Sequence, residues 1–186
     1  SEVGPTATAA YRFFFAIPIL WAWMAFDNTK SDKPAMPARP SDYFLLFTIG
    51  ACFALDLFTW HWSITITTIS NATLLNNLTI VFVALFAWVI LKEKPTLNLM
   101  IGIGLALAGA AVLVGQSGDG AEGAIIGDLL GLLSAVFYAG YIVTTKYLRQ
   151  FFTSTTIMAW SALPSFYLLC GILSVNLKDN MYNDIG

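Results

Sequence analysis

The chain has 186 residues, of which 58% are hydrophobic and only 11% are charged, and its mean hydropathy is +0.73. A typical soluble protein carries about 25% charged residues. A molecule this small has too little interior to bury so many apolar side chains, so lipid must cover part of its surface, and a soluble domain is excluded. The net charge is −2 and the sequence contains no basic run, so nucleic-acid binding is not expected.

Six apolar segments are long enough to cross a bilayer as helices. A hydrocarbon core about 30 Å thick needs about 20 helical residues. The segments cover roughly residues 7–26, 43–65, 70–91, 97–115, 126–147 and 155–175. We therefore predict an all-α fold, a polytopic bundle of transmembrane helices. Cys52 and Cys170 lie inside these segments without a CxxC pattern, so neither a disulfide framework nor a metal site is expected.

Basic residues are distributed unevenly between the two sides of the predicted bundle. Alternate loops must lie on opposite sides, which groups 27–42, 92–96 and 148–154 on one side. That side collects Lys30, Lys33, Arg39, Lys92, Lys94, Lys146 and Arg149, whereas the other side has Arg12 and Lys178. Because cytoplasmic loops are enriched in Lys and Arg, these three loops are predicted to be cytoplasmic.

The third and fourth segments resemble a known family. Residues 70–94 read SNATLLNNLTIVFVALFAWVILKEK, and residues 101–113 read IGIGLALAGAAVL. Together with Tyr11-Arg12-Phe13 and with GDLLGLLSAVFYA from residue 127, they resemble the EamA-type repeat of the drug/metabolite transporter superfamily. Glu93 belongs to the family pattern. The family often places Gly before this glutamate, where this chain has Lys92, so the tightness of that turn is in question.

The resemblance implies a transporter of ten helices in two inverted five-helix repeats, with solute carried through a central cavity. Residues 1–116 would form the first repeat without its first helix, and residues 117–186 would begin the second. The chain would then be a fragment containing helices two to seven. Pro18 and Pro164 would occupy the middle of equivalent helices, which makes them hinge candidates. The alternative is ordinary proline tolerated in a membrane helix.

Asp56 is the most informative single residue. It lies inside the second apolar segment, where an ionised carboxylate costs about 2.5–3.5 kcal/mol. We predict that it lines the solute path and binds the coupling proton, and the alternative is a structural hydrogen bond or ion pair. Arg12 lies five residues inside the outer end of the first segment. It either reaches the lipid headgroups or turns inward to offset Asp56 or attract an anionic solute.

Asn76 and Asn77 are expected at the depth of Asp56. The chain reverses near residues 67–68, so position 56 is mirrored at about position 79 in the next segment. These three polar side chains are predicted to meet in one layer that lines the path. The alternative is an interhelical hydrogen bond, worth on average ~0.6 kcal/mol in membranes. Trp60 is one turn from Asp56 on the same face, where it either walls the path or anchors the helix at the interface.

The fifth segment carries one polar stripe. Ser134, Tyr138, Tyr141 and Thr145 recur at i, i+4, i+7 and i+11. We predict that Tyr138 and Tyr141 line a solute path that suits moderately polar or aromatic solutes, with helix packing as the alternative.

Three further features have mainly structural interpretations. The glycines of the fourth segment, Gly102, Gly104 and Gly109, favour close helix packing. Glu93 is expected to pair with its neighbours Lys92 and Lys94. Asp128 is expected to complement the N-terminus of its helix.

These features favour a secondary transporter or permease of small organic metabolites or drugs that works by alternating access. No GxxxxGK[ST] motif supports ATP hydrolysis, so the energy is expected from a proton or a solute gradient. No HExxH or GxSxG motif occurs, so an intramembrane enzyme is a weaker alternative, as is a non-transporting scaffold or sensor. We expect no cofactor, a small solute and the lipid bilayer as partners, and a location in a bacterial cytoplasmic membrane. The sequence is compatible with a homodimer.

Overall fold

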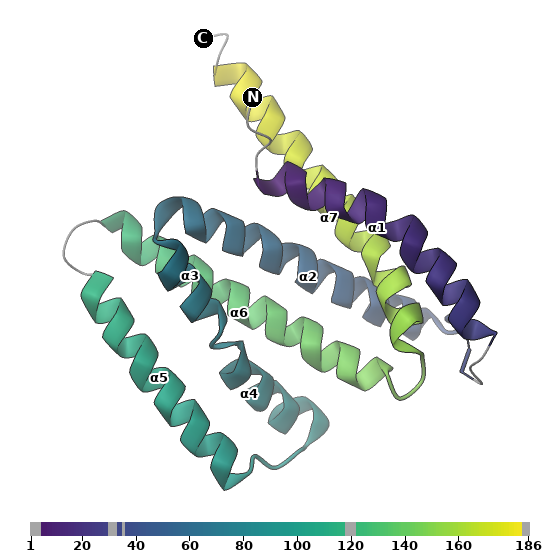
Figure 1. Ribbon diagram of the computed structural model, residues 1–186, viewed down its shortest axis with the longest axis horizontal. Helices are drawn as coiled ribbons and strands as arrows, with labels where there is room; N and C mark the ends of the chain where they lie inside the picture. Colours follow the sequence, from purple (N-terminus) through teal and green to yellow (C-terminus); the bar gives the residue numbers. More distant parts are fainter. Residues whose placement is uncertain (1–4, 30–32, 35, 118–121, 184–186) are drawn as a thin grey trace. The chain divides into compact units, whose positions relative to one another are not determined.

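The computed structural model describes residues 5–29, 33–34, 36–117 and 122–183. Regular structure in these residues is entirely helical, which confirms the predicted all-α fold (Figure 1). The helices are α1 (Pro5–Asn28), α2 (Pro40–Ile66), α3 (Ile69–Asn76), α4 (Thr79–Leu91), α5 (Leu97–Ser117), α6 (Glu122–Leu148) and α7 (Ser154–Asn183).

Four segments are long and apolar enough to cross a membrane. They are Pro40–Ile66, Ile69–Leu91, Ile125–Leu148 and Ser154–Ile172, and Leu97–Val112 is a shorter apolar helix. With this many candidate spans, the chain is an integral, multi-pass membrane protein. Helix α1 is not among the four, so its crossing of the membrane stays a prediction.

The third predicted segment is broken in the middle. It was expected to be one helix, but Asn77 and Leu78 separate α3 from α4 (Figure 1). Thr68 caps α3, because its hydroxyl accepts a hydrogen bond from the backbone N–H of Asn71 at 3.2 Å. At the break, Thr79 Oγ1 donates to the carbonyl oxygen of Asn76 at 2.6 Å. This bond satisfies a backbone group that would otherwise lack a partner in lipid.

Helix α4 ends on a residue with positive φ. Lys92 has φ 56° and ψ 25°, the left-handed conformation that glycine usually supplies after a helix. The backbone N–H of Glu93 donates to the carbonyl oxygen of Ala87 at 3.2 Å and closes the turn. The tight turn is therefore retained without glycine, at a cost in backbone strain.

Contacts divide the chain into two compact units. The first combines residues 1–54 with 148–186, and the second is residues 55–147. They do not coincide with the repeats expected at 1–116 and 117–186, and that division stays a prediction.

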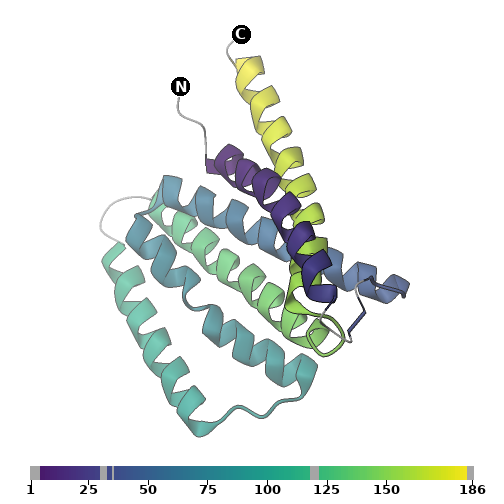
Figure 2. The same ribbon diagram turned by 45° about the vertical axis from the view of Figure 1, so that its right-hand side comes forward.

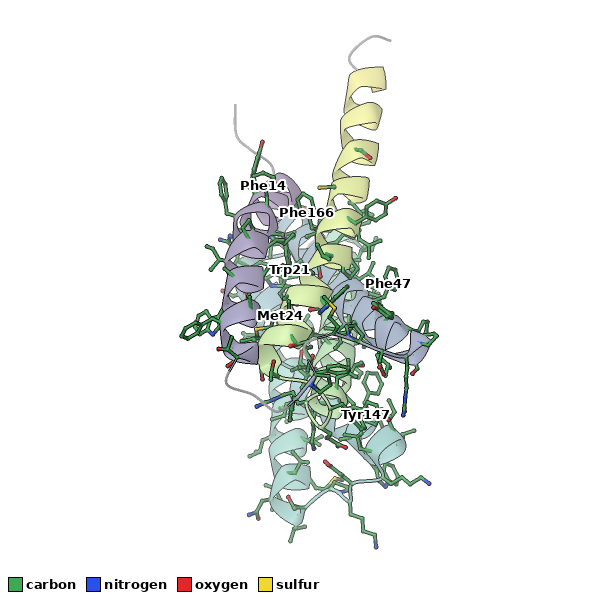
Figure 3. All side chains as sticks on the ribbon, turned by 90° about the vertical axis from the view of Figure 1, so that its right-hand side faces the viewer. Phe14, Trp21, Met24, Phe47, Tyr147 and Phe166 are labelled. Carbon is green, nitrogen blue, oxygen red and sulfur yellow. The ribbon has the colours of Figure 1, made fainter. Side chains whose placement is uncertain are left out.

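In the first unit, α1 and α7 lie side by side and antiparallel (Figures 1 and 2). The ring centroids of Trp21 and Trp160 are 5.3 Å apart, and those of Phe14 and Phe166 are 6.3 Å apart. Phe14 and Phe166 are labelled in Figure 3. Because Trp21 contacts Trp160 and Phe14 contacts Phe166, Pro18 on α1 lies opposite about residue 163 on α7. The two hinge candidates Pro18 and Pro164 thus lie at one level of this helix pair.

Close helix packing depends on glycines other than those expected. A Cβ added to Gly50 on α2 would lie 2.4 Å from the carbonyl oxygen of Ser161 and 2.5 Å from Pro164 Cγ on α7. Added to Gly127 on α6, it would lie 2.8 Å from the Cβ of Thr67, the residue that follows α2. The glycines of α5, Gly102, Gly104 and Gly109, have nothing within 4 Å of such a Cβ. The close approach expected of α5 is therefore not found among the described residues.

Two contacts connect loops that were predicted to be cytoplasmic. In the first unit, Lys33 Nζ donates to the carbonyl oxygen of Arg149 at 2.6 Å. In the second unit, Lys146 forms an ion pair with Glu93 at 2.5 Å. The first contact joins two of the three basic loops, and the second joins the 92–96 loop to the last turn of α6; their cytoplasmic location stays a prediction. Lys30, which was counted with them, lies outside the described residues.

Candidate functional site

Three polar side chains from three helices of the second unit form a closed hydrogen-bonded triangle, which we call the carboxylate triad. Ser134 Oγ on α6 donates to Oδ1 of Asp56 on α2 at 2.5 Å. Asn76 Nδ2, at the end of α3, donates to the same oxygen at 3.2 Å and to Ser134 Oγ at 2.5 Å. The amide nitrogen thus contacts both other members of the triad, and the hydroxyl both accepts and donates.

The triad is buried inside membrane-spanning helices. Asp56 is 6% exposed and Ser134 is fully buried. Both hydrogen bonds to Asp56 reach Oδ1, and Oδ2 accepts none from the described residues. Oδ2 is also not among the fully enclosed polar atoms that lack a partner, so it retains a small accessible surface. One oxygen is therefore held by two donors, and the other has no donor among the described residues.

The triad lies beside the break between α3 and α4. Asn76 is the last residue of α3, and its carbonyl oxygen accepts the hydroxyl of Thr79, the first residue of α4. Thr79 Oγ1 also lies 3.4 Å from the carbonyl oxygen of Ala135 on α6. One hydrogen bond of Asp56 therefore involves the residue at which the helix is interrupted, Asn76.

The remaining residues of the predicted layer are placed differently. Asn77 caps the C-terminus of α3, and its side chain is exposed and makes no hydrogen bond with the described residues. Trp60 is half-buried on α2 and packs edge-on against His61, with 5.1 Å between the ring centroids. His61 Nδ1 lies 2.6 Å from the carbonyl oxygen of Leu57 on its own helix. Of the three residues predicted to form one polar layer, the structure brings together Asp56 and Asn76 but not Asn77.

The aromatic pair on α6 continues from Ser134 toward the predicted cytoplasmic end. The rings of Tyr138 and Tyr141 are stacked, with 5.7 Å between centroids and 6° between planes. One turn further, Thr145 Oγ1 is enclosed and has no hydrogen-bond partner among the described residues. A hydroxyl, two parallel rings and a second hydroxyl therefore follow one another along one side of α6.

Two further predicted residues, Arg12 and Glu93, are not members of the triad. Arg12 is exposed on α1, in the first unit, and its pairing with Asp56 stays a prediction. Glu93 binds Lys146 on α6, whereas its chain neighbours Lys92 and Lys94 had been expected. Among the described residues no group of three His, Cys, Asp or Glu side chains could hold a metal ion.

Asp128 does not serve as a helix cap. It lies about two turns inside α6, where Oδ1 accepts a hydrogen bond at 2.8 Å from Oγ1 of Thr67, the residue that follows α2. Its side chain is only 4% exposed. The contact with Thr67 was not predicted from the sequence. The available signal was only a hydroxyl residue and a carboxylate that lie far apart along the chain.

The helices and the buried carboxylate between them define a multi-pass membrane protein with a polar site inside its spans. Residues 1–115 match the EamA-like transporter family, and the chain belongs to that family. Over 172 residues it is 27% identical to an uncharacterized transporter of Archaeoglobus fulgidus. The alignment covers 90% of this chain and 57% of the relative, so the chain spans little more than half of that protein's length. No solved structure matches.

Proposed function

We propose that this chain forms part of a secondary transporter that moves small organic solutes across a cytoplasmic membrane by alternating access, with the carboxylate triad as its proton-coupled site. The observation that carries the proposal is the closed triangle of Asp56, Asn76 and Ser134 at a helix break. Membership of the EamA-like transporter family supports transport over a scaffold or an enzyme.

The position of the triad supports transport. Ionisable groups within membrane helices are costly and usually mark ion or substrate pathways. Interrupted helices in secondary transporters commonly line the site near the bilayer middle, because backbone freed from the helix remains stable only where it faces protein or a cavity. The break between α3 and α4 and the buried Asp56 occur together here.

Protonation of Asp56 provides the coupling. The ionised carboxylate accepts two hydrogen bonds at Oδ1 from Asn76 and Ser134. A proton added at Oδ2 neutralises the group and weakens both charge-assisted bonds. Asn76 at the end of α3 then becomes free to turn toward solute, so proton binding alters the helix at its break.

The antiparallel pairing of α1 and α7 supports the inverted-repeat architecture. These helices would be the second helices of the two repeats. Equivalent helices related by a two-fold axis in the membrane plane run in opposite directions, as α1 and α7 do. Pro18 and Pro164 lie at one level of this pair and act as the hinges.

The solute class follows from the stripe on α6. The stacked rings of Tyr138 and Tyr141 offer an aromatic surface, and the polar groups of the carboxylate triad lie at the end of the stripe that Ser134 occupies. Such a surface binds planar or aromatic organic molecules that carry a few polar groups.

The function is tested by screening and then by transport. Purified protein in lipid nanodiscs is scanned for a rise in thermal midpoint with a panel of aromatic amino acids, nucleobases and aromatic amines. A solute that stabilises the wild-type protein is then assayed for uptake into proteoliposomes. Uptake that requires the protein supports a transporter. Binding without uptake contradicts the proposal and indicates a sensor, and chemical conversion of the solute indicates an enzyme.

A further inference from the structure

The turn of residues 92–96 carries two lysines without a counter-charge. It joins α4 to α5 (Figure 1) and follows the apolar segment Ile69–Leu91, so it lies where the chain leaves the hydrocarbon core. Lys92 and Lys94 are both exposed, and neither forms an ion pair or a hydrogen bond within the described part of the chain. Two cations, separated by one residue, are therefore available at the membrane surface.

The acidic residue between these lysines is already neutralised. Glu93 forms an ion pair with Lys146 at the end of α6, with 2.5 Å between Oε2 and Nζ. Helices α3, α4 and α5 contain no acidic residue, and those of α6, Glu122 and Asp128, lie near its opposite end. The turn and the adjoining end of α6 therefore keep an excess of positive charge.

Lys92 occupies this position at a cost in backbone strain. It is the only non-glycine residue with positive φ, 56°, in the described ranges. Glycine would adopt this conformation without a Cβ clash. Because the side chain is exposed, packing does not explain the presence of lysine here. Strained backbone that persists often marks a functional contact. The group that Lys92 offers and glycine lacks is an ammonium, which suits an anionic partner.

Exposed apolar side chains flank the turn on both helices. The last turn of α4 exposes a tryptophan and two aliphatic residues, and the first turns of α5 expose three more apolar residues. They are Trp88, Val89, Ile90, Leu97, Met100 and Ile101. Tryptophan is enriched at the depth of the lipid headgroups. A free phosphate ion needs only the cations, whereas a phospholipid also needs apolar surface beside them. The combination favours a lipid.

We propose that the turn between α4 and α5 binds an anionic phospholipid, with Lys92 and Lys94 contacting the phosphate and the exposed apolar side chains beside the turn contacting the acyl chains. Glu93 does not repel the phosphate, because Lys146 neutralises it. The surface of a cytoplasmic leaflet is negative and attracts basic side chains, which agrees with the predicted cytoplasmic location of this turn. The proposal requires only that the chain spans a membrane and does not depend on transport.

Native mass spectrometry of the purified chain tests the proposal. The protein in detergent is mixed with increasing dioleoyl phosphatidylglycerol, which is anionic, or with dioleoyl phosphatidylcholine, which has the same acyl chains and no net charge. The wild type should retain phosphatidylglycerol at the lower concentration. A variant with both Lys92→Gln and Lys94→Gln should need about tenfold or more phosphatidylglycerol for the same retention, with phosphatidylcholine unchanged. Equal retention of the two lipids by the wild type, or wild-type retention by the variant, overturns the proposal.

The control removes the same charge from elsewhere on the predicted cytoplasmic side. Arg39 and Arg149 are both exposed, and the variant with Arg39→Gln and Arg149→Gln should retain phosphatidylglycerol within about twofold of the wild type. A loss as large as that of the lysine variant would show unspecific attraction and contradict a site at this turn. Replacing Lys92 and Lys94 by arginine keeps the charge and should preserve retention.

Lys92→Gly separates lipid binding from folding. It relieves the strained backbone and removes one cation, so the thermal midpoint in phosphatidylcholine nanodiscs should rise while retention of phosphatidylglycerol falls about fivefold. Unchanged retention contradicts a role for the ammonium group. Glycerol phosphate, the soluble headgroup alone, should not displace the bound lipid at equal concentration. Displacement would indicate a phosphate-ion site and overturn the assignment to a lipid.

Discussion

Ser134 on α6 and Asp56 on α2 are 78 residues apart in the sequence, yet the hydroxyl of one donates directly to the carboxylate of the other at 2.5 Å. In the proposed architecture these helices belong to different repeats. A change in the protonation of Asp56 therefore acts on both repeats at one point. This is the physical requirement for a proton to bias two alternating conformations.

Ser134→Ala should destabilise the protein by about 1–3 kcal/mol, because it leaves the buried carboxylate with one donor and the Asn76 amide with one acceptor fewer. The thermal midpoint in nanodiscs measures the effect. Ser174→Ala is the matched control, since that exposed hydroxyl binds only the carbonyl oxygen of Gly171 on its own helix. In an Asp56→Asn background the cost of Ser134→Ala should change by about 0.5–3 kcal/mol. Additive effects would show that the two side chains are not coupled.

Asn76 and Asn77 are adjacent but should differ in function. Asn76→Ala removes two hydrogen bonds of the triad, so uptake of the screened solute into proteoliposomes should fall about tenfold or more, in line with a loss of at least 1.4 kcal/mol. Asn77→Ala should transport within about twofold of the wild type, because that side chain is exposed and makes no hydrogen bond with the described residues. Equal losses in the two variants would argue against the triad as the relevant site.

Gly50→Ala should lower the thermal midpoint, at a cost of about 1–3 kcal/mol. The added methyl group meets backbone at Ser161 and the rigid ring of Pro164, so helices α2 and α7 must separate. Gly109→Ala on α5 has open space and should be neutral or stabilising by about 0.5–1 kcal/mol, because alanine favours a helix over glycine. Comparable destabilisation of the two variants would contradict the packing described.

Lys92→Gly should stabilise the protein by about 1 kcal/mol, because glycine adopts the left-handed conformation at φ 56° without a Cβ clash. The substitution also restores the residue that the family often has at this turn. Lys94→Gly removes a charge two residues further on and is the control, with no stabilisation expected. If the midpoint for Lys92→Gly is unchanged or lower, the turn is not strained.

The sequence was sufficient for the helices and for part of the site. Apolar length predicted the segments, and the reversal near residues 67–68 put Asn76 at the depth of Asp56, where the structure has it bonded. The break at Asn77 and Leu78 could not be foreseen, because residues 69–91 contain neither Pro nor Gly. Hydropathy describes one continuous apolar segment there, whereas in the structure the helix is interrupted beside the contact of Thr79 with Ala135 on α6.

Contacts between residues far apart in the sequence could not be predicted from the sequence either. Ser134 was recognised as one member of a stripe, but its register against Asp56 depends on the close approach of Gly127 and Gly131 to α2 and α3. Likewise, Asp128 near the start of an apolar segment looked like a helix-terminal charge. Its burial against Thr67 follows from that same helix packing, which no local pattern encodes.

The most direct test of the central claim is solute-linked proton movement in proteoliposomes that contain wild-type protein or Asp56→Asn. With a solute that the wild type transports, we predict that Asp56→Asn still exchanges labelled for unlabelled solute at equal concentrations but moves no protons with it. If Asp56→Asn moves protons with the solute as the wild type does, Asp56 is not the coupling group and the account is wrong.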